Sequence, residues 1–219
     1  MRIIRVNKTI LLNSIIAINV VVIATIGIVF GAGEGQLGNY IIGWGYFKPY
    51  TMDSNILAGI MAILVLVYSV RDRHNNGIPR WLIRAYLMGT TCLVLTFLIA
   101  ATFLAPVKVM SGSNYFTMFS KDMFFFHFLN PLLAVISFLA LADGEKLSRM
   151  DSVIGMIPTI VYSIIYFVMV VVLKLWNDFY HFTFGGKYYL IPIVVVVIYG
   201  TTYTISSLLI RIHNHFAST

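Results

Sequence analysis

The stretch Phe47-Lys-Pro-Tyr-Thr-Met-Asp-Ser-Asn55 places four polar side chains directly before a long apolar run at 56–70. Its proline suits the first turn of a helix, where the N–H that proline lacks would have no partner. If a helix begins here, Thr51, Ser54 and Asn55 share one face at positions i, i+3 and i+4. Polar groups at a membrane helix end need protein partners, because lipid offers none. The stretch therefore predicts a helix start and a polar site together.

The overall composition is that of a polytopic membrane protein. Of the 219 residues, 59% are hydrophobic and 11% are charged, and the mean hydropathy is +0.89; a soluble domain has about 25% charged residues. The net charge of +7 is explained by basic cytoplasmic loops, so no nucleic-acid partner is expected. The single cysteine, Cys92, lies in an apolar run, which excludes a disulfide framework and a cysteine metal site.

Six apolar runs approach or exceed the roughly 20 residues that cross the hydrocarbon layer of a membrane. We expect an all-α membrane protein that forms one integral domain over residues 1–219. The helices are predicted at about 9–31, 52–70, 82–105, 123–142, 152–173 and 190–211. The first run follows basic residues, as in a signal peptide, but it exceeds the apolar core of about 7–15 residues typical of one. It is therefore interpreted as an uncleaved membrane helix.

Lysine and arginine are divided unequally between the two ends of these helices. One end carries ten of them, including a dense group between 71 and 84, and the other end carries five. Because cytoplasmic loops are enriched in basic residues, both termini are predicted to be cytoplasmic, in what is expected to be a bacterial cell membrane. The three outer loops, at about 32–51, 106–122 and 174–189, are the more elaborate ones and direct attention to the outer face.

A second polar group lies at the start of the fourth predicted helix, in Phe124-Phe-Phe-His-Phe-Leu-Asn-Pro-Leu-Leu133. An imidazole in so apolar a run is costly unless it is paired or faces a polar cavity. A buried, neutral His127 can accept a proton. Asn130 lies one turn further and could orient the ring, and the proline that follows frees a carbonyl that could bond the same ring. The alternatives are a histidine that bonds a neighbouring helix for packing, and a ligand-binding or proton-carrying group.

Thr51 is the candidate nucleophile. A threonine hydroxyl needs a base to attack, and the N–H groups of a helix start could stabilise an oxyanion. Thr51 and His127 are both predicted near the outer ends of inward-running helices, so the question for the structure is whether they meet. The plainer alternative for Thr51 is a helix N-cap. Thr117 is a rival hydroxyl, because Phe116–Lys121 weakly repeats the pattern of Tyr50–Asn55.

Other polar residues are expected to support this site. Asp53 is either a first-turn acid that the helix dipole favours, a group that orients the histidine, or a cation ligand. Ser54 and Asn55 are expected to bond to neighbouring helices. Asp178 and His181 in the third outer loop either complete a relay, bind a metal or form a solvated loop pair.

Sequence motifs exclude several other chemistries. The chain has no His/Glu spacing typical of zinc, no P-loop and no G-x-S-x-G elbow, so no metal or other cofactor is expected. No predicted span carries two or more acidic residues at its centre, which disfavours an ion-driven transporter.

An aromatic-Tyr-Thr-x-x-Ser-Asn opening to the second helix, followed later by a His before Asn-Pro, resembles bacterial relatives of the androgen-induced and androgen-dependent integral membrane proteins. Those are multi-pass threonine hydrolases that cleave fatty acid esters of hydroxy fatty acids. The resemblance covers the six-helix layout, and its specific part is Thr51 with Asn55, and His127. It implies that Thr51 is the nucleophile and His127 the base, that an acyl-threonine forms, and that membrane lipids and a fatty-acyl ester are the partners.

The competing hypothesis is binding or transport of a small molecule at the outer face without chemistry. Substrate-capture subunits of vitamin importers are similar in size and also have six short-looped helices. They would use outer aromatic residues such as Trp44, Tyr46 and Trp176 to hold a ligand. Their small-residue docking stripe in the first helix is missing here, since Ala17 and Ala24 are seven residues apart. A structural membrane protein without a small ligand is a third possibility. The oligomeric state is not predicted.

Overall fold

The computed structural model describes residues 10–22, 25, 47–71, 78–141 and 146–217, and within these ranges it is all-helical. The predicted fold class is therefore confirmed. Five helical segments are long and apolar enough to cross a membrane: Tyr50–Arg71, Arg80–Met110, Asp122–Ala140, Met150–Val172 and Tyr188–Phe216. A shorter apolar helix, Ile10–Val22, covers part of the first predicted span at 9–31, and the rest of that span lies largely outside the described residues.

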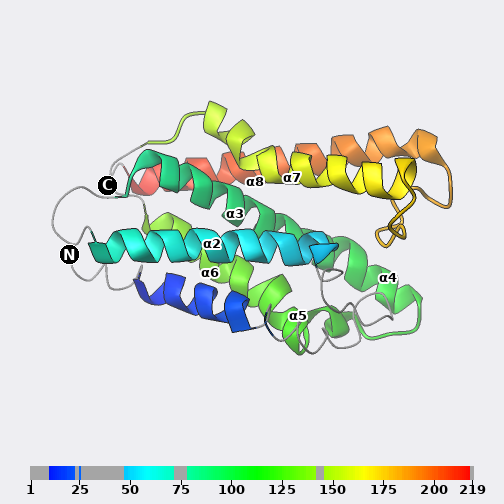
Figure 1. The fold of residues 1–219 in the computed structure, drawn as a ribbon, viewed down its shortest axis with the longest axis horizontal. Helices are drawn as coiled ribbons and strands as arrows, with labels where there is room; N and C mark the ends of the chain where they lie inside the picture. The colour runs from blue at the N-terminus through cyan, green and yellow to red at the C-terminus, as the bar shows by residue number, and fades with distance from the viewer. Residues whose placement is uncertain (1–9, 23–24, 26–46, 72–77, 142–145, 218–219) are drawn as a thin grey trace.

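The long segments run side by side as a bundle (Figure 1). Several of them combine α-helical parts with π-helical or 3-10 parts. The first three spans are α2 (Tyr50–Arg71), then α3 (Arg80–Ile99) with η2 (Ala100–Leu104) and α4 (Ala105–Met110), then α5 (Asp122–Phe124) with η4 (Phe125–Leu129) and α6 (Asn130–Ala140). The 3-10 turn η3 (Tyr115–Phe119) precedes α5, and the last spans are α7 (Met150–Phe167) with η5 (Val168–Val172) and η6 (Tyr188–Leu190) with α8 (Ile191–Phe216).

Two prolines explain where two of the π-helical parts lie. A proline ring inside a helix clashes with the carbonyl four residues earlier and cannot donate to it. For Pro106 that residue is Thr102, in η2, and for Pro131 it is His127, in η4. The wider π turn accommodates the clash, so the segment Arg80–Met110 continues beyond residue 105, where the sequence predicted its end. In the segment Asp122–Ala140, the same effect sets the backbone that carries the candidate histidine.

The helix α3 occupies the middle of the bundle and packs against α2, α6, α7 and α8 (Figure 1). Its close contact with α7 and α8 depends on Gly155. A Cβ atom at this position would collide with the Ser206 hydroxyl and crowd that of Thr91. Both hydroxyls are buried. The glycine therefore sets how closely these three helices approach.

Replacing Gly155 by alanine is expected to destabilise the bundle by about 1–3 kcal/mol, the usual cost of overpacking a core. The expected result is a lower midpoint for thermal unfolding in detergent, measured on purified protein. Gly200 in α8 is the matched control, because a Cβ there meets nothing within 4 Å. An equal change in both variants would contradict the packing role of Gly155.

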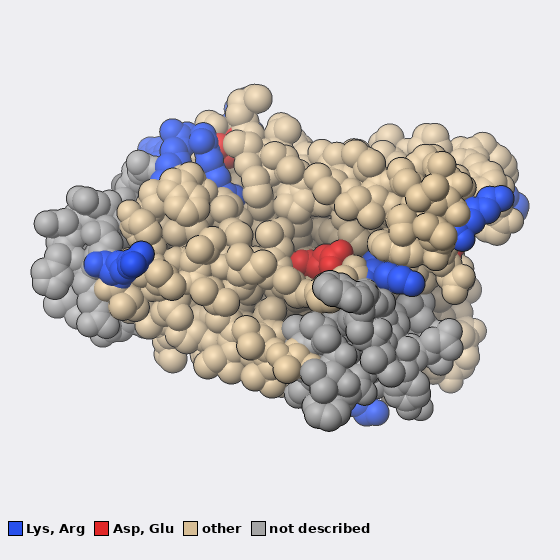
Figure 2. Space-filling view, viewed as in Figure 1, with Lys and Arg blue, Asp and Glu red and all other residues tan. Residues whose placement is uncertain are grey.

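Basic residues lie toward the two ends of the bundle. Figure 2 shows Lys and Arg atoms toward both ends of the molecule, and a group of acidic atoms nearer its middle. At one end the buried Asp151 carboxylate accepts a 2.7 Å hydrogen bond from Arg84 and another from the Ser148 N–H. An isolated carboxylate in an apolar bundle would be costly, so these partners account for its burial.

The helix Ile10–Val22 runs antiparallel to α6. Asn13 bonds to Ser137 at 2.8 Å, and Asn19 bonds to Asn130 at 3.3 Å, so the order of contacts is reversed along the two helices. The end of α6 also stacks on the end of α8 through Phe138 and His213, so Ile10 and the end of α8 lie at the same end of the bundle. That both termini are cytoplasmic stays a prediction.

Candidate functional site

The two candidate groups lie together. Thr51, in the first turn of α2, points its hydroxyl oxygen at Nε2 of His127 in η4, with 3.4 Å between the two atoms. Thr51 is 5% exposed and His127 is fully buried. The separation is longer than an ordinary hydrogen bond, but it is within the range that a nucleophile and its base show before a substrate binds.

The other ring nitrogen determines which proton His127 carries. Its Nδ1 atom lies 2.7 Å from the backbone carbonyl oxygen of Met118, in η3. A carbonyl oxygen only accepts hydrogen bonds, so Nδ1 must carry the proton and donate it. In the neutral ring, Nε2 then carries the lone pair, and this nitrogen is the one next to the Thr51 hydroxyl. The Met118 carbonyl thus takes the orienting part that a carboxylate plays in a Ser-His-Asp triad.

Amide side chains connect the helices around this pair. The Asn55 amide donates to the Thr51 carbonyl at 2.8 Å and approaches the Phe126 carbonyl at 3.4 Å. Asn130 donates to Asn55 at 2.9 Å and accepts from Asn19. The prediction that Asn55 bonds to a neighbouring helix is confirmed. Asn130 does not orient the imidazole as hypothesised, because it is engaged by these two asparagines. The freed Phe126 carbonyl likewise faces Asn55 and not the ring.

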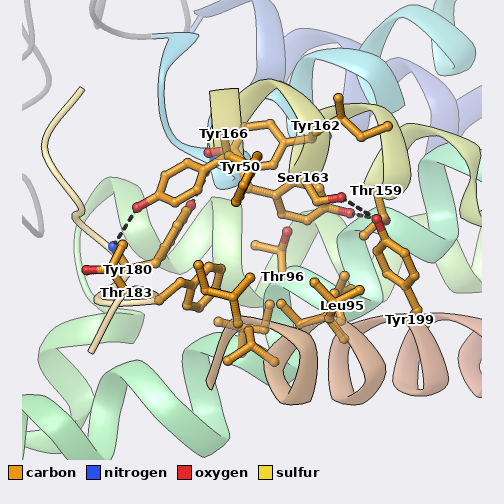
Figure 3. Close-up of a pocket in the computed structure, with 18 of the residues that line it drawn as sticks. Tyr50, Leu95, Thr96, Thr159, Tyr162, Ser163, Tyr166, Tyr180, Thr183 and Tyr199 are labelled. Carbon is orange, nitrogen blue, oxygen red and sulfur yellow. Dashed lines mark hydrogen bonds between the residues drawn. The ribbon is translucent and has the colours of Figure 1, made fainter. Parts of the chain in front are cut away.

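A cavity of about 250 Å³ lies beside Thr51. Side chains of α3, α7, α8 and the loop before α8 form its wall, which is largely aliphatic and aromatic with scattered hydroxyl groups. Figure 3 shows Tyr180 and Thr183 toward one end of it and Tyr199 toward the other. Thr51 lines the cavity and His127 does not, so Thr51 connects the imidazole to this space.

The cavity lies next to the lateral surface of the helix bundle. Two of its wall residues, Ile164 and Phe167, are 57% and 43% exposed. The wall of the cavity therefore reaches the surface of the bundle, which in a membrane would meet lipid chains. The phenylalanines around His127 do not line the cavity: Phe126 is buried in the bundle, and Phe124 and Phe128 are exposed on its surface.

The backbone donors of the helix start are already engaged. The N–H of Tyr50 donates to the Tyr180 hydroxyl at 2.8 Å. The N–H groups of Met52 and Asp53 donate to the Pro49 carbonyl. The expectation that these N–H groups would be available to an oxyanion is therefore not supported for Tyr50, Met52 and Asp53.

The remaining polar residues near Thr51 are placed as follows. Ser54 donates to the Thr51 carbonyl at 3.0 Å and contacts Thr96 of α3 at 2.9 Å, as expected of a residue that bonds to a neighbouring helix. The half-buried Asp53 carboxylate makes no hydrogen bond or ion pair with the described residues, and it does not orient His127. The rival Thr117 is exposed on η3, away from the imidazole that its neighbour Met118 holds.

Asp178 and His181 do not form a catalytic or metal pair. Asp178 accepts hydrogen bonds from the Tyr166 hydroxyl, from the N–H of Phe182 and from both the N–H and the hydroxyl of Thr183. His181 is exposed, and only its backbone N–H contacts Asp178. Asp178 therefore organises the loop that carries Tyr180. Within the described part of the chain, no group of three or more His, Cys, Asp or Glu residues could hold a metal ion.

Replacing Asp178 by asparagine is expected to destabilise this loop by about 1–3 kcal/mol, since hydrogen-bond donors lose a charged acceptor. Burial alone would raise the pKa of Asp178, but the hydrogen bonds from Thr183, Tyr166 and Phe182 together lower it below its usual value. A lowered pKa in the folded state means that the stabilisation is fully present above about pH 4 and is lost as the pH falls further.

The measurement is thermal unfolding of the wild type and the asparagine variant at several values between about pH 6 and about pH 3. The difference between the two midpoints is expected to shrink on acidification. A difference that stays constant or widens would contradict the role given to the ionised carboxylate.

Two features of the site had no strong signal in the sequence. A backbone carbonyl such as that of Met118 is present at every residue, so no residue type marks it. Tyr180 stood out only as one of several aromatic residues in the third outer loop.

Comparisons with protein-family models, with curated proteins and with solved structures find no match for this chain.

Proposed function

We propose that this protein is an intramembrane hydrolase of fatty-acyl esters, with Thr51 as nucleophile and His127 as general base. The observation that carries the proposal is the 3.4 Å contact between the Thr51 hydroxyl and Nε2 of His127, beside an apolar cavity. A hydroxyl side chain next to a histidine ring also occurs in contacts that only hold helices together. Here the tautomer imposed by Met118 leaves the basic nitrogen facing the hydroxyl, which is the arrangement that proton abstraction needs.

The reaction follows from these positions. His127 takes the Thr51 proton on Nε2 while the threonine oxygen attacks the ester carbonyl, giving a tetrahedral oxyanion. The oxyanion collapses, and the departing alkoxide receives the proton from Nε2, which leaves an acyl-threonine. Water then attacks this ester with His127 again as base, and the fatty acid leaves as the Thr51 oxygen recovers its proton. The net reaction is ester plus water giving acid plus alcohol.

The resemblance to the androgen-induced and androgen-dependent integral membrane hydrolases supports the same assignment. It rests on Thr51, Asn55 and His127, and all three lie in one hydrogen-bonded group. With both termini cytoplasmic in a bacterial cell membrane, the site would lie toward the outer leaflet, and the ester substrate would be a membrane lipid. The apolar wall that reaches the bundle surface supports a lipid over a water-soluble ester.

Binding or transport of a small molecule without chemistry is the alternative. The observation that favours it is the number of hydroxyl groups on the cavity wall, more than a passive acyl-chain pocket requires. The two functions differ in one respect that can be measured, because only the hydrolase forms a covalent bond to Thr51.

A long-chain alkyl fluorophosphonate, which modifies serine and threonine hydrolases at the nucleophile, tests this directly. Purified protein in detergent would be labelled, digested and sequenced by mass spectrometry. The expected adduct lies on Thr51 and is absent when His127 is replaced by alanine. Labelling elsewhere, or saturable binding of a fatty-acyl ester with neither adduct nor turnover, would favour the binding function.

A further inference from the structure

The proposed reaction needs a hydrogen-bond donor for the oxyanion that develops beside Thr51. Such donors are among the largest contributors to acyl-transfer catalysis. The backbone N–H groups of Tyr50, Met52 and Asp53 already have acceptors in the protein. Among the described residues, the hydroxyl groups of the cavity wall beside Thr51 are therefore the candidates.

Most of these hydroxyls have already committed their proton to a strong acceptor. Three donate to backbone carbonyls: Tyr162 to Lys48 at 2.7 Å, Thr96 to Cys92 at 3.0 Å and Ser163 to Ile160 at 2.8 Å. Two donate to the Asp178 carboxylate: Tyr166 at 2.9 Å and Thr183 at 2.6 Å. Since the Ser163 proton is used, Tyr199 must be the donor in the 2.6 Å contact between those two hydroxyls.

The last pair to account for is Tyr50 and Thr159. Their hydroxyls bond to each other at 2.8 Å, and Thr159 also contacts the Cys92 sulfur at 3.8 Å. The two hydroxyls of this pair can therefore serve as donor and acceptor for each other. The Tyr50 ring reaches across to Thr159 of α7 (Figure 3), so its hydroxyl is engaged there.

Tyr180 is different. Its phenol oxygen accepts the Tyr50 N–H at 2.8 Å. Among the described residues, no carbonyl or carboxylate accepts a hydrogen bond from its own proton, and its neighbour there is the Tyr162 hydroxyl. A hydroxyl is a weaker acceptor than a developing oxyanion, so a substrate can replace it. Burial raises the pKa of Tyr180, which keeps the phenol protonated near neutral pH.

We propose that the Tyr180 hydroxyl is the oxyanion donor of this site, held next to Thr51 by the loop that Asp178 organises. The inference rests on the proposed function. As the Thr51 oxygen bonds to the ester carbon, the carbonyl electron pair moves to the carbonyl oxygen, and this oxygen accepts a hydrogen bond from Tyr180. The bond weakens again when the oxyanion collapses, so Tyr180 remains a phenol throughout. The Tyr50 N–H that donates to its oxygen makes it a better donor.

The test is Tyr180→Phe, compared with the wild type in detergent, with a fluorogenic long-chain acyl ester as substrate. The rate of the acylation burst is expected to fall by about 10²–10³-fold, the usual effect of losing one oxyanion donor. A long-chain alkyl trifluoromethyl ketone, which forms a tetrahedral adduct with the nucleophile, should lose affinity by a similar factor. The matching methyl ketone, which binds as a ground-state analogue, should bind nearly as before.

Controls separate this chemistry from a structural role. Tyr162→Phe removes the bond to the Lys48 carbonyl, so it reports any loosening of the segment before Thr51, and its loss is expected to be far smaller. Tyr203→Phe, at an exposed position on α8, should behave as the wild type. If Tyr180→Phe does not fold, a fluorinated tyrosine at 180 keeps the acceptor oxygen. Its acylation should fail at a lower pH than that of the wild type, because its phenol ionises at lower pH.

Different results overturn different claims. An unchanged burst for Tyr180→Phe, an equal loss of affinity for both ketones, or an equal loss of activity in Tyr162→Phe would overturn the oxyanion role alone. A wild-type protein that never forms an acyl-threonine would overturn the proposed function, and the role of Tyr180 with it.

Discussion

Replacing Thr51 by valine is expected to reduce ester hydrolysis to background, a loss of at least about 10³–10⁴-fold in kcat. Valine keeps the branched shape of threonine and has a methyl group in place of the hydroxyl, so the packing around the first turn of α2 is preserved. Thr51→Ala should have the same effect on turnover. The measurement is hydrolysis of a fluorogenic fatty-acyl ester by purified variants, with thermal unfolding as the check that each is folded.

Other threonines supply the controls for this experiment. Thr204→Val, at an exposed site on α8, should leave turnover unchanged. Thr117→Val tests the rival hydroxyl and is also expected to retain turnover. Thr51→Ser should retain part of the activity, because serine also has a hydroxyl group at this position. Undiminished turnover by folded Thr51→Val would show that another group is the nucleophile.

Replacing His127 by alanine should cost about as much as losing the nucleophile, because the two act as one unit and their effects are not additive. The double variant with Thr51→Val is accordingly expected to be no slower than either single variant. Truncation leaves a space where the ring contacted the Met118 carbonyl. Added imidazole is therefore expected to restore part of the turnover in His127→Ala and none in Thr51→Val.

The comparison for this variant is His181→Asn, since asparagine tolerates the positive φ of 55° found at that position. Its turnover should match the wild type, because His181 is exposed and makes no side-chain pair with Asp178. A large loss in His181→Asn with retained activity in His127→Ala would reverse the assignment of the base.

Much of the candidate site was predictable from its residue types. Thr51, Asn55, His127 and Asn130 are polar residues in apolar runs, and lipid gives such residues no partner, so they must find one another. The similar depth predicted for Thr51 and His127 is consistent with the contact between them. The partners themselves were not predictable in every case. Asn130 faces Asn55 instead of the imidazole, because the asparagines of three helices meet at one crossing.

The loop before α8 shows a different kind of limit. The sequence offered Asp178 and His181 as a pair because they are three residues apart. The backbone instead turns so that four donors converge on the Asp178 carboxylate and His181 points outward. Loop conformation depends on which contacts close the turn, and residue spacing alone does not specify it.

The sequence by itself determined that this is an all-helical membrane protein and which hydroxyl and imidazole stand out within it. Hydropathy is a local property, and an unpaired polar group in an apolar run is costly wherever the chain folds. The tertiary structure alone decided the 3.4 Å contact, the tautomer of His127 and the cavity beside Thr51. These depend on how helices cross and on the direction of one backbone carbonyl, and both are set by packing between segments far apart in the chain.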